Sequence, residues 1–304
     1  MIYTVTLNPA LDYTADATSF FPGKTNRTQN EYVVPGGKGL NVSIILERLG
    51  DKTTSLGFYS GFTGHELIRL MEEMNCKCDF SEVEKGFTRI NVKLQTSRGI
   101  TEFNGSGIAI SAEDTEKLKT KISSLKEGDW LVLSGSVPKG MSTDIYKELA
   151  MTAPRGVKTV IDTSGIPLSS SLEAHPFLIK PNTDEISELF QKPVETFEDI
   201  SLYAVKLKEM GARNVMVSMD SRGAVLFTEN GEIYTSLPPE GKVLNTVGAG
   251  DSSIAGFIHK YSESENMEES LKFAVSSGSA TAYSPWLAEA ELIYELYQKM
   301  KETH

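Results

Sequence analysis

Short apolar runs with β-strand composition alternate with amphipathic helical segments along most of this chain. We expect strands at residues 54–58, 130–134, 159–162, 177–180 and 215–218, separated by helices near residues 63–74, 113–125, 143–153, 184–190 and 198–210. A strand followed by a helix usually leads to a parallel neighbouring strand, because the helix then covers one face of the sheet. The alternation predicts an α/β fold in which helices cover both faces of a mainly parallel sheet.

The two ends of the chain extend this pattern. A short β-rich run at residues 2–7 stops at Asn8-Pro9, and a helical period follows at residues 39–49. Nearly all of the chain after Gly250 is expected to be helical, with apolar periods in residues 250–262, 268–282 and 288–301.

Two segments interrupt the alternation. Residues 10–35 have no helical period and are expected to be extended chain and turns. Residues 88–96 and 99–104 are two polar-apolar alternating runs joined by Ser97-Arg98, which predicts a hairpin. We expect the two insertions, at about residues 10–35 and 86–106, to meet as a small β-sheet lid over the end of the main sheet, within one domain spanning residues 1–304.

The charge balance limits the partners of this protein. The chain has 41 acidic and 30 basic residues and a net charge of −11. A negative field repels polyphosphate backbones and anionic lipid, so we expect neither a nucleic-acid partner nor a membrane surface. An anionic substrate would have to be bound by a few local cations.

The cysteines and the apolar segments suggest a cytoplasmic protein. Cys76 and Cys78 have no further cysteine or His-x-His pair to complete a zinc site, so we interpret them as reduced thiols. No basic leader precedes the first apolar residues, and no stretch approaches the roughly 20 apolar residues of a membrane span.

The segment from Asn245 to Ser252 (NTVGAGDS) carries the strongest chemical signal. Its glycines allow consecutive backbone N–H groups to converge at the start of a helix, where the helix dipole also attracts anions. Asp251 beside this anion hole is placed to accept a proton from a hydroxyl that attacks a bound phosphoryl group. Taken alone, Asp251 is equally well explained as a helix N-cap that follows a turn.

A second glycine-rich loop, Gly36 to Asn41 (GGKGLN), also leads into a helix. It is neither a nucleotide P-loop nor a dinucleotide fingerprint, because the required glycine and hydroxyl positions differ. The Lys38 ammonium and the Asn41 amide offer groups for a phosphate and a hydroxyl. A solvated lysine in a tight turn is as good an explanation of this loop alone.

Together these loops resemble the two signatures of the ribokinase-like, or PfkB, sugar kinases over essentially the full chain. The segments TLNPALDY, GGKGLN, TRINVK and KPNTDE are most similar to the members that phosphorylate sugar phosphates. The resemblance implies a three-layer α/β/α fold and the transfer of a phosphoryl group from ATP, with Mg²⁺, to the C6 hydroxyl of fructose 1-phosphate. Tagatose 6-phosphate and fructose 6-phosphate are the alternative acceptors.

The resemblance also implies roles for individual residues. Asp251 would be the base, and the N–H groups of Gly248, Ala249 and Gly250 would stabilise the migrating phosphoryl group. The implied sugar-binding residues are Asp12, Gly37 and Asn41, and the cations for the existing phosphate are Lys38, Arg27 and Arg89. Without the resemblance, Asp12 is better explained as a turn residue and Arg27 as a solvated charge at a sheet edge.

The nucleotide and metal positions come from the same resemblance. Asn182 and Glu185 would organise Mg²⁺ partly through water, a role compatible with a capping box at the start of a helix. The nucleotide-binding residues would be Lys180, Ser218, Asp220, Gly223, Ser277 and Gly278. The sequence departs from the family at Ser218-Met219-Asp220, where threonine-leucine-glycine is commoner, and at Asn245, where most members have aspartate.

Other functions remain open at this point. A catalytically silent regulator that binds a sugar phosphate or nucleotide is possible, since a fold does not fix a function. A dinucleotide oxidoreductase is disfavoured by the missing fingerprint after the first strand. The exposed face of the lid is a plausible contact for a homodimer. The four histidines, which lie outside every motif, are interpreted as structural or surface residues.

Overall fold

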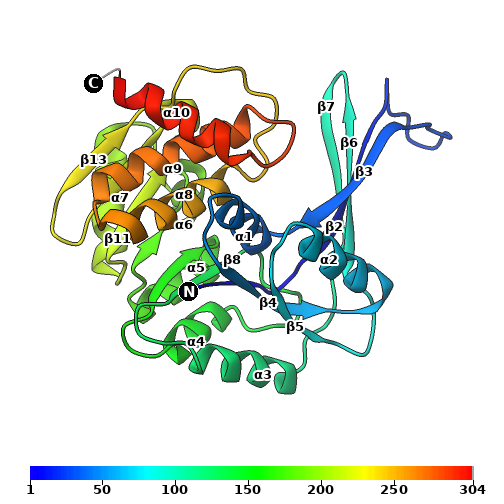
Figure 1. Cartoon of the computed structure of the whole chain (residues 1–304), viewed down its shortest axis with the longest axis horizontal. Coiled ribbons are helices and arrows are strands. Elements are labelled where there is room, and N and C mark those ends of the chain that lie inside the picture. The colour runs from blue at the N-terminus through cyan, green and yellow to red at the C-terminus, as the bar shows by residue number, and fades with distance from the viewer. Residues whose placement is uncertain (303–304) are drawn as a thin grey trace.

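A computed structural model describes residues 1–302 of the chain. Its main feature is a nine-stranded sheet in the order β13-β12-β11-β10-β9-β8-β1-β4-β5 (Figure 1). Every neighbouring pair from β11 to β5 is parallel, whereas β12 is antiparallel to both β11 and β13. The strands are β1 (Ile2–Thr6), β4 (Thr53–Tyr59), β5 (Cys78–Glu82), β8 (Trp130–Ser134), β9 (Lys158–Asp162), β10 (Leu178–Ile179), β11 (Asn214–Ser218), β12 (Ala224–Phe227) and β13 (Ile233–Ser236).

Helices cover both faces of this sheet, as the sequence predicts. One apolar cluster packs one face of the strands against α1 (Lys38–Arg48), α2 (Gly61–Glu73), α8 (Ala249–Ser264), α9 (Met267–Ala282) and α10 (Ala290–Glu302). The other packs the opposite face against α3 (Ala112–Ser123), α4 (Ile145–Thr152), α5 (Gly165–Ser171), α6 (Thr183–Phe190) and α7 (Phe197–Glu209). In β8, Val132 belongs to the first cluster and Leu133 to the second, as the two-residue period of a strand requires.

Four elements were absent from the sequence-based expectations. β5 has the polar sequence CDFSE and lies at a sheet edge. None of its residues is fully buried, so its sequence lacks the apolar pattern that predicts a strand. β12 and β13 form a short antiparallel hairpin at the other edge, and α5 spans only seven residues. The strand expected at residues 177–180 is reduced to β10, because regular pairing stops before Lys180.

A second sheet of four strands, in the order β3-β2-β6-β7, projects from the body of the molecule (Figure 1). It consists of β2 (Ala10–Asp16), β3 (Gln29–Gly36), β6 (Arg89–Thr96) and β7 (Gly99–Asn104), and we call it the small sheet. β2 and β6 pair in parallel at its centre, so the two insertions do meet in space as the sequence predicts. The small sheet is mixed, because its outer pairs β2–β3 and β6–β7 are antiparallel.

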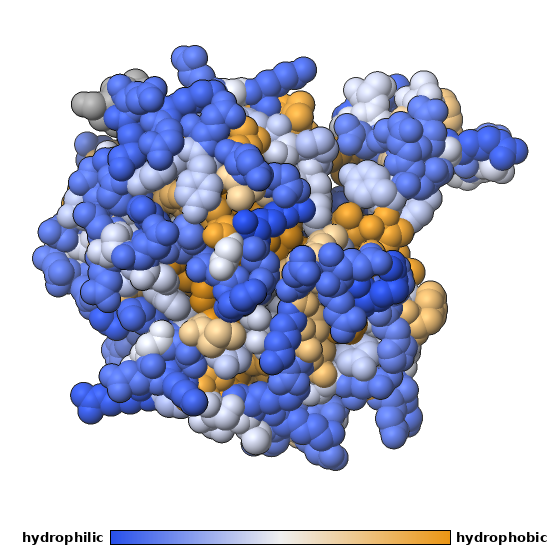
Figure 2. Space-filling view, in the orientation of Figure 1, coloured by the Kyte–Doolittle hydropathy of each residue, from blue (hydrophilic) through white to orange (hydrophobic). Residues whose placement is uncertain are grey.

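The two faces of the small sheet differ in chemistry. Register places Asp12 beside Asn91 on one face and Tyr13 beside Val92 on the other. The row Val33-Tyr13-Val92-Phe103 runs across all four strands, and we call this face the apolar face. Val33 is 41% exposed and Phe103 53% exposed. The space-filling view shows apolar side chains at the base of the small sheet, beside the body (Figure 2).

Within residues 1–302, no helix combines the length and the apolar character needed to cross a membrane.

Candidate active site

A cavity of about 1220 Å³ lies where the carboxyl ends of the central strands face the small sheet. In open α/β sheets this edge is where ligands bind, because loops and helix N-termini converge there. The walls include residues of β1, the α1 entry, β2 and β6 on one side, and the α6 and α8 entries and the loop after β13 on the other.

The floor of the cavity is a row of strand ends. Parallel register aligns Thr6, Ser134 and Asp162 across β1, β8 and β9, and Lys180 follows β10 beside them. The Lys180 ammonium forms an ion pair with Asp162 Oδ1 at 3.3 Å, and both side chains are buried. A buried cation is tolerated here because a carboxylate accompanies it.

Asp162 also binds Lys38 of the Gly36–Asn41 loop. The Lys38 ammonium lies 3.0 Å from Asp162 Oδ2, and the negative charge of Asp162 raises the Lys38 pKa despite partial desolvation. Burial opposes ionisation of Asp162, but Lys180 and Lys38 together hold its pKa below the ordinary value. Asp162 was missed in the sequence analysis, although an acidic residue that ends a buried parallel strand was an available signal.

The glycine-rich segment from Asn245 to Ser252 forms the N-terminus of α8, as predicted. Gly248 is its N-cap with φ of 82°, and a Cβ there would lie 2.6 Å from Leu287 Cδ2, so only glycine fits. A Cβ at Gly250 would lie 3.0 Å from the Lys180 ammonium. The backbone of Gly250 therefore approaches the Lys180 cation closely, and residues 248–250 all line the cavity.

Asp251 lies on the first turn of α8 and is only 5% exposed. The Asn41 amide donates to Asp251 Oδ2 at 2.7 Å. Burial and the negative charge of Asp162 raise the pKa of the Asp251 carboxyl to about 6, while Lys38, the Asn41 hydrogen bond and Lys180 oppose the rise. Asn41 was expected to join Asp12 at the sugar hydroxyls, but its contact within the protein is with Asp251.

Asp12 faces the cavity from β2. Asn91 donates to Asp12 Oδ1 at 2.9 Å, and Lys93 donates to Oδ2 at 2.7 Å, so both carboxylate oxygens are held by β6. A Cβ at Gly36 would overlap the Asp12 carboxylate, which explains a glycine on the neighbouring strand. Lys93 lines the cavity and was not identified in the sequence analysis.

The two predicted arginines lie in different environments. Arg89 lines the cavity, and its guanidinium donates to the carbonyl oxygens of Asn8 and Gly105 at 3.1 and 3.2 Å. Arg27 is exposed in the loop between β2 and β3 and does not line this cavity. The structure therefore does not bring Arg27 to the site of its own chain, since the loop carries it beyond the face that holds Asp12.

The predicted nucleotide residues also divide. Lys180, Ser218, Asp220, Gly223 and Gly278 line the cavity. Ser277 does not: it is fully buried between α8 and α9, where its hydroxyl donates to the Phe273 carbonyl and its side chain fills the space over Gly256. Helical phase explains the error, because adjacent residues on α9 point in different directions. The cavity also includes residues that were not predicted, from Pro238 to Gly241, Val243 and Tyr283.

Asn182 and Glu185 form the capping box that the sequence predicts. Asn182 Oδ1 accepts from the Glu185 N–H at 2.7 Å, and Glu185 Oε2 accepts from the Asn182 N–H at 2.9 Å. Among residues 1–302, no three His, Cys, Asp or Glu side chains form a metal cluster by themselves. Mg²⁺ usually needs only one or two protein carboxylates plus water and phosphate oxygens. Both oxygens of Asp162 are buried without an aligned hydrogen bond, and Glu185 keeps one carboxylate oxygen outside the capping box, so the donor set fits this ion.

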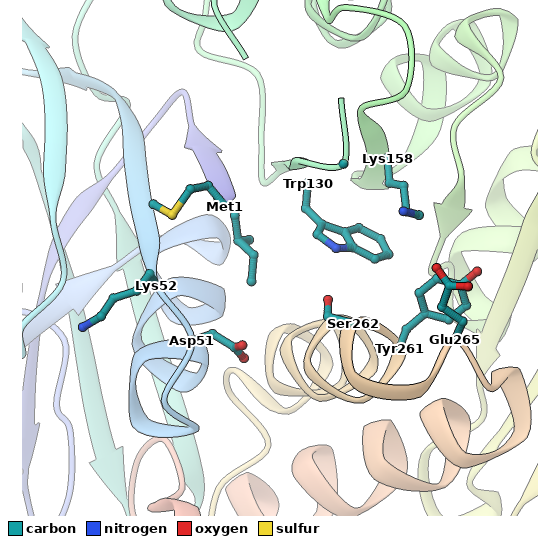
Figure 3. Close-up of a pocket in the computed structure, with 10 residues that line it drawn as sticks. Met1, Asp51, Lys52, Trp130, Lys158, Tyr261, Ser262 and Glu265 are labelled. Atoms are coloured by element: carbon teal, nitrogen blue, oxygen red, sulfur yellow. The ribbon is translucent and has the colours of Figure 1, made fainter. Parts of the chain in front are cut away.

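A smaller pocket of about 320 Å³ lies at the amino ends of β1, β8 and β9, opposite the large cavity (Figure 3). Trp130 separates Met1 from Lys158 there, and Tyr261 and Ser262 of α8 face it. The Lys158 ammonium lies 5.5 Å from the Trp130 ring centre. This pocket lacks the glycine-rich helix entry and the cluster of buried ionisable side chains found in the large cavity, so we assign the active site to the latter.

Comparison with known proteins agrees with this geometry. Residues 5–288 match the pfkB family carbohydrate kinase domain. The chain is 43% identical over 304 residues to 1-phosphofructokinase of Bacillus subtilis, covering 100% of this chain and 99% of the relative. It is 34% identical over 306 residues to D-tagatose-1-phosphate kinase of Bacillus licheniformis, covering 100% of both.

The fold matches solved structures of Escherichia coli phosphofructokinase-2. Its complex with substrates and products aligns with a TM-score of 0.92 at 28% identity, covering 99% of each chain. A tetrameric inhibited form of that protein aligns with a TM-score of 0.91 at 29% identity, covering 99% of each chain.

These findings define a sugar kinase with the ribokinase-like α/β fold. The chain belongs to the pfkB family of carbohydrate kinases, which confirms the resemblance stated from its motifs. Its activity is a phosphotransfer to an alcohol group.

We expect Asp251→Asn to stabilise the fold while it removes the base. A carboxyl pKa raised from 3.8 to about 6 means that ionising Asp251 at pH 8 destabilises the folded state, by about 3 kcal/mol. This destabilisation appears as pH rises from the unfolded-state pKa through 6, so the advantage of the variant should be largest at pH 8 and about half as large at pH 5. Urea unfolding of wild type, Asp251→Asn and the exposed control Asp144→Asn measures it; equal stabilities at pH 8 would contradict the raised pKa.

We expect Asp162→Asn to shift the acid limb of kcat/KM toward lower pH. The wild-type limb should lie near pH 6, because Asp251 must be ionised to act as a base. Removing the negative charge of Asp162 leaves Lys38 and Lys180 to stabilise the Asp251 carboxylate, which lowers its pKa. A pH profile of wild type, Asp162→Asn and Asp144→Asn measures this shift, and an unchanged limb in Asp162→Asn would argue against the coupling.

Proposed function

We propose that this protein transfers the γ-phosphoryl group of ATP to the C6 hydroxyl of D-fructose 1-phosphate, which makes it a 1-phosphofructokinase. The observation that carries the proposal is the buried Asp251 carboxylate, which faces the cavity at the N-terminus of α8. Full-length similarity to 1-phosphofructokinase of Bacillus subtilis supports the named acceptor. The two free thiols, Cys76 and Cys78, suit the reducing cytoplasm in which we propose it acts.

Asp251 would act as the general base. Its ionised carboxylate accepts the proton of the C6 hydroxyl as the oxygen attacks phosphorus, and a pKa near 6 keeps it mostly ionised at neutral pH. The Asn41 hydrogen bond to Oδ2 fixes the carboxylate, leaving Oδ1 for the hydroxyl. The backbone N–H groups of Gly248, Ala249 and Gly250 and the dipole of α8 would stabilise negative charge on the transferred group.

The nucleotide would lie along the β10, β11 and α8 side of the cavity. Lys180 and Lys38 supply positive charge near the α8 N-terminus, and Ser218, Asp220, Gly223 and Gly278 line the remaining wall. Asn182 and Glu185, with Asp162 nearby, would hold Mg²⁺, which when bound neutralises phosphate charge and orients the phosphates.

The small sheet would act as a lid within a single domain. Asp12 projects from it into the cavity and would accept hydrogen bonds from sugar hydroxyls. Gly36 leaves room for the Asp12 carboxylate, and Gly37 lines the cavity. Arg89 would bind the phosphate that the sugar already carries. Closure of this sheet over a bound sugar phosphate would exclude water from the phosphoryl group.

A second acceptor deserves a direct test. The full-length relative from Bacillus licheniformis is a D-tagatose-1-phosphate kinase. Tagatose differs from fructose only in the configuration at C4, so a site built around C1 phosphate and the C6 hydroxyl has one stereocentre to discriminate.

A substrate panel tests the proposal. We expect ADP release to depend on fructose 1-phosphate, with a higher kcat/KM than for tagatose 1-phosphate, fructose 6-phosphate or tagatose 6-phosphate. Asp251→Asn should lower kcat by about 10³-fold and leave the KM for ATP nearly unchanged, because proton removal is lost while nucleotide contacts remain. No acceptor-dependent ADP release would favour the silent regulator instead, and a preference for another acceptor would replace the named substrate.

We further propose that the apolar face of the small sheet pairs with a second copy of the chain. Val33 and Phe103 expose an apolar row that a monomer would leave in water. Because Arg27 does not line its own cavity, any phosphate contact that it makes would be in the partner's site.

Sedimentation experiments test this contact. We expect wild type to be a dimer and Val33→Lys and Phe103→Lys to be monomers, since a lysine on this face must be desolvated on pairing. Phe197→Lys, at an exposed position on α7, is the matched control and should remain dimeric. A wild type that stays monomeric at every concentration would rule out this interface.

A further inference from the structure

The charged side chains of the cavity separate into two groups of opposite sign. At the strand ends, Lys38 and Lys180 accompany the carboxylates of Asp162, Asp251 and Glu185, an excess of one negative charge that suits a metal ion. On the small sheet, Arg89 and Lys93 accompany Asp12 alone, an excess of one positive charge that suits an anion. The other charged residues of the wall, Asp220 and Glu240, are exposed on the nucleotide side.

Lys38 belongs to the first group, although the sequence analysis assigned it to the phosphate of the sugar. Its ammonium lies 3.0 Å from Asp162, and Asp251 and Glu185 add to the negative potential around it. The cation is therefore held at the strand ends, where the phosphoryl group would be transferred. The phosphate at the far end of the sugar needs other cations.

Lys93 occupies the small-sheet side. Arg89, Asn91 and Lys93 alternate along β6 and share the face that carries Asp12. The Lys93 ammonium donates to Asp12 Oδ2 at 2.7 Å, and its side chain is 15% exposed in the cavity wall. An ammonium has three N–H donors, so two remain for a ligand. Glu102, its neighbour on β7, is exposed and accepts a hydrogen bond from Asn104 rather than from Lys93.

Arg89 reinforces the positive potential without a carboxylate in contact. Its two hydrogen bonds go to neutral backbone carbonyl oxygens, and within residues 1–302 it forms no ion pair. Burial lowers the Arg89 pKa, and the negative charge of Asp12 opposes this only in part. A partly desolvated cation of this kind gains most from a bound anion.

We propose that Lys93, together with Arg89, recognises the phosphate that the sugar already carries, and that the Lys93–Asp12 ion pair holds both side chains in place for this. The inference rests on the proposed function and specifies which residues select a phosphorylated sugar. Lys93 then has two roles. It holds Asp12, which would accept hydrogen bonds from sugar hydroxyls, and it binds the phosphate monoester. A lysine that only neutralised Asp12 would affect sugars with and without phosphate equally.

The experiment compares two acceptors in two variants. Lys93→Gln keeps an N–H donor for Asp12 but removes the charge, and Lys93→Arg keeps the charge. Initial rates at high enzyme concentration give kcat/KM for fructose 1-phosphate and for unphosphorylated fructose, and KM for ATP is measured alongside. Lys126→Met, which removes an exposed lysine outside the cavity, is the control, and thermal unfolding checks that each variant is folded.

We expect Lys93→Gln to lower kcat/KM for fructose 1-phosphate about 30-fold or more, mainly through KM, and to change kcat/KM for fructose and KM for ATP by less than about threefold. Lys93→Arg should recover most of the loss. Equal losses for both acceptors, or no loss for fructose 1-phosphate, would overturn the role in phosphate recognition. If wild type fails to use fructose 1-phosphate but uses another sugar phosphate, the proposed function fails, and the same comparison with that sugar still decides the role of Lys93.

Discussion

The active site depends on one buried carboxylate, Asp162, held between two lysines. Parallel register places Asp162, at the end of β9, directly beside Lys180, which follows β10. Lys38, the first residue of α1, forms the other ion pair with Asp162. Removing either lysine would leave the buried Asp162 carboxylate with one counter-charge fewer, so the three side chains stabilise one another. The same carboxylate repels Asp251 and so adjusts the acidity of the proposed base. The two buried lysines, the proposed metal site and the proposed base are therefore linked through a single residue.

The small sheet combines two chemistries in one layer because strands alternate their side chains. Its polar face presents Asp12, Arg89 and Lys93 to the cavity, whereas its apolar face leaves Val33 and Phe103 in contact with water. A one-residue slip between β2 and β6 would exchange these faces, so the register that places Asp12 beside Asn91 is a functional constraint. Gly36 contributes to this constraint, because any larger residue would displace the Asp12 carboxylate.

The features that could be predicted from the sequence are those that depend on residues close together in the chain. The glycines before Asp251, the Asn182–Glu185 capping box and the alternating strand and helix pattern all depend on neighbours in the chain, so their structures were predictable. Ser277 was assigned wrongly to the cavity because its direction depends on how α9 packs against α8, which no local pattern records. Asp162 and Lys93 were missed for a related reason. The partners of each side chain come from a neighbouring strand that is separate in the sequence. The position of Arg27 depends on a long loop whose course residue types do not determine.

The pairing of β2 with β6 also affects how the molecule can assemble. β2 and β3 alone form a two-stranded hairpin, which is at best marginally stable in water. Their third strand follows more than fifty residues later, after β4, α2 and β5 have been made. During synthesis from the N-terminus, Asp12 therefore has no fixed position until β6 docks against it. The half of the site that we propose binds the sugar is completed by a long-range event that is slow on entropic grounds. Local unfolding that begins by separating these two strands would remove acceptor binding while the nine-stranded sheet stayed intact.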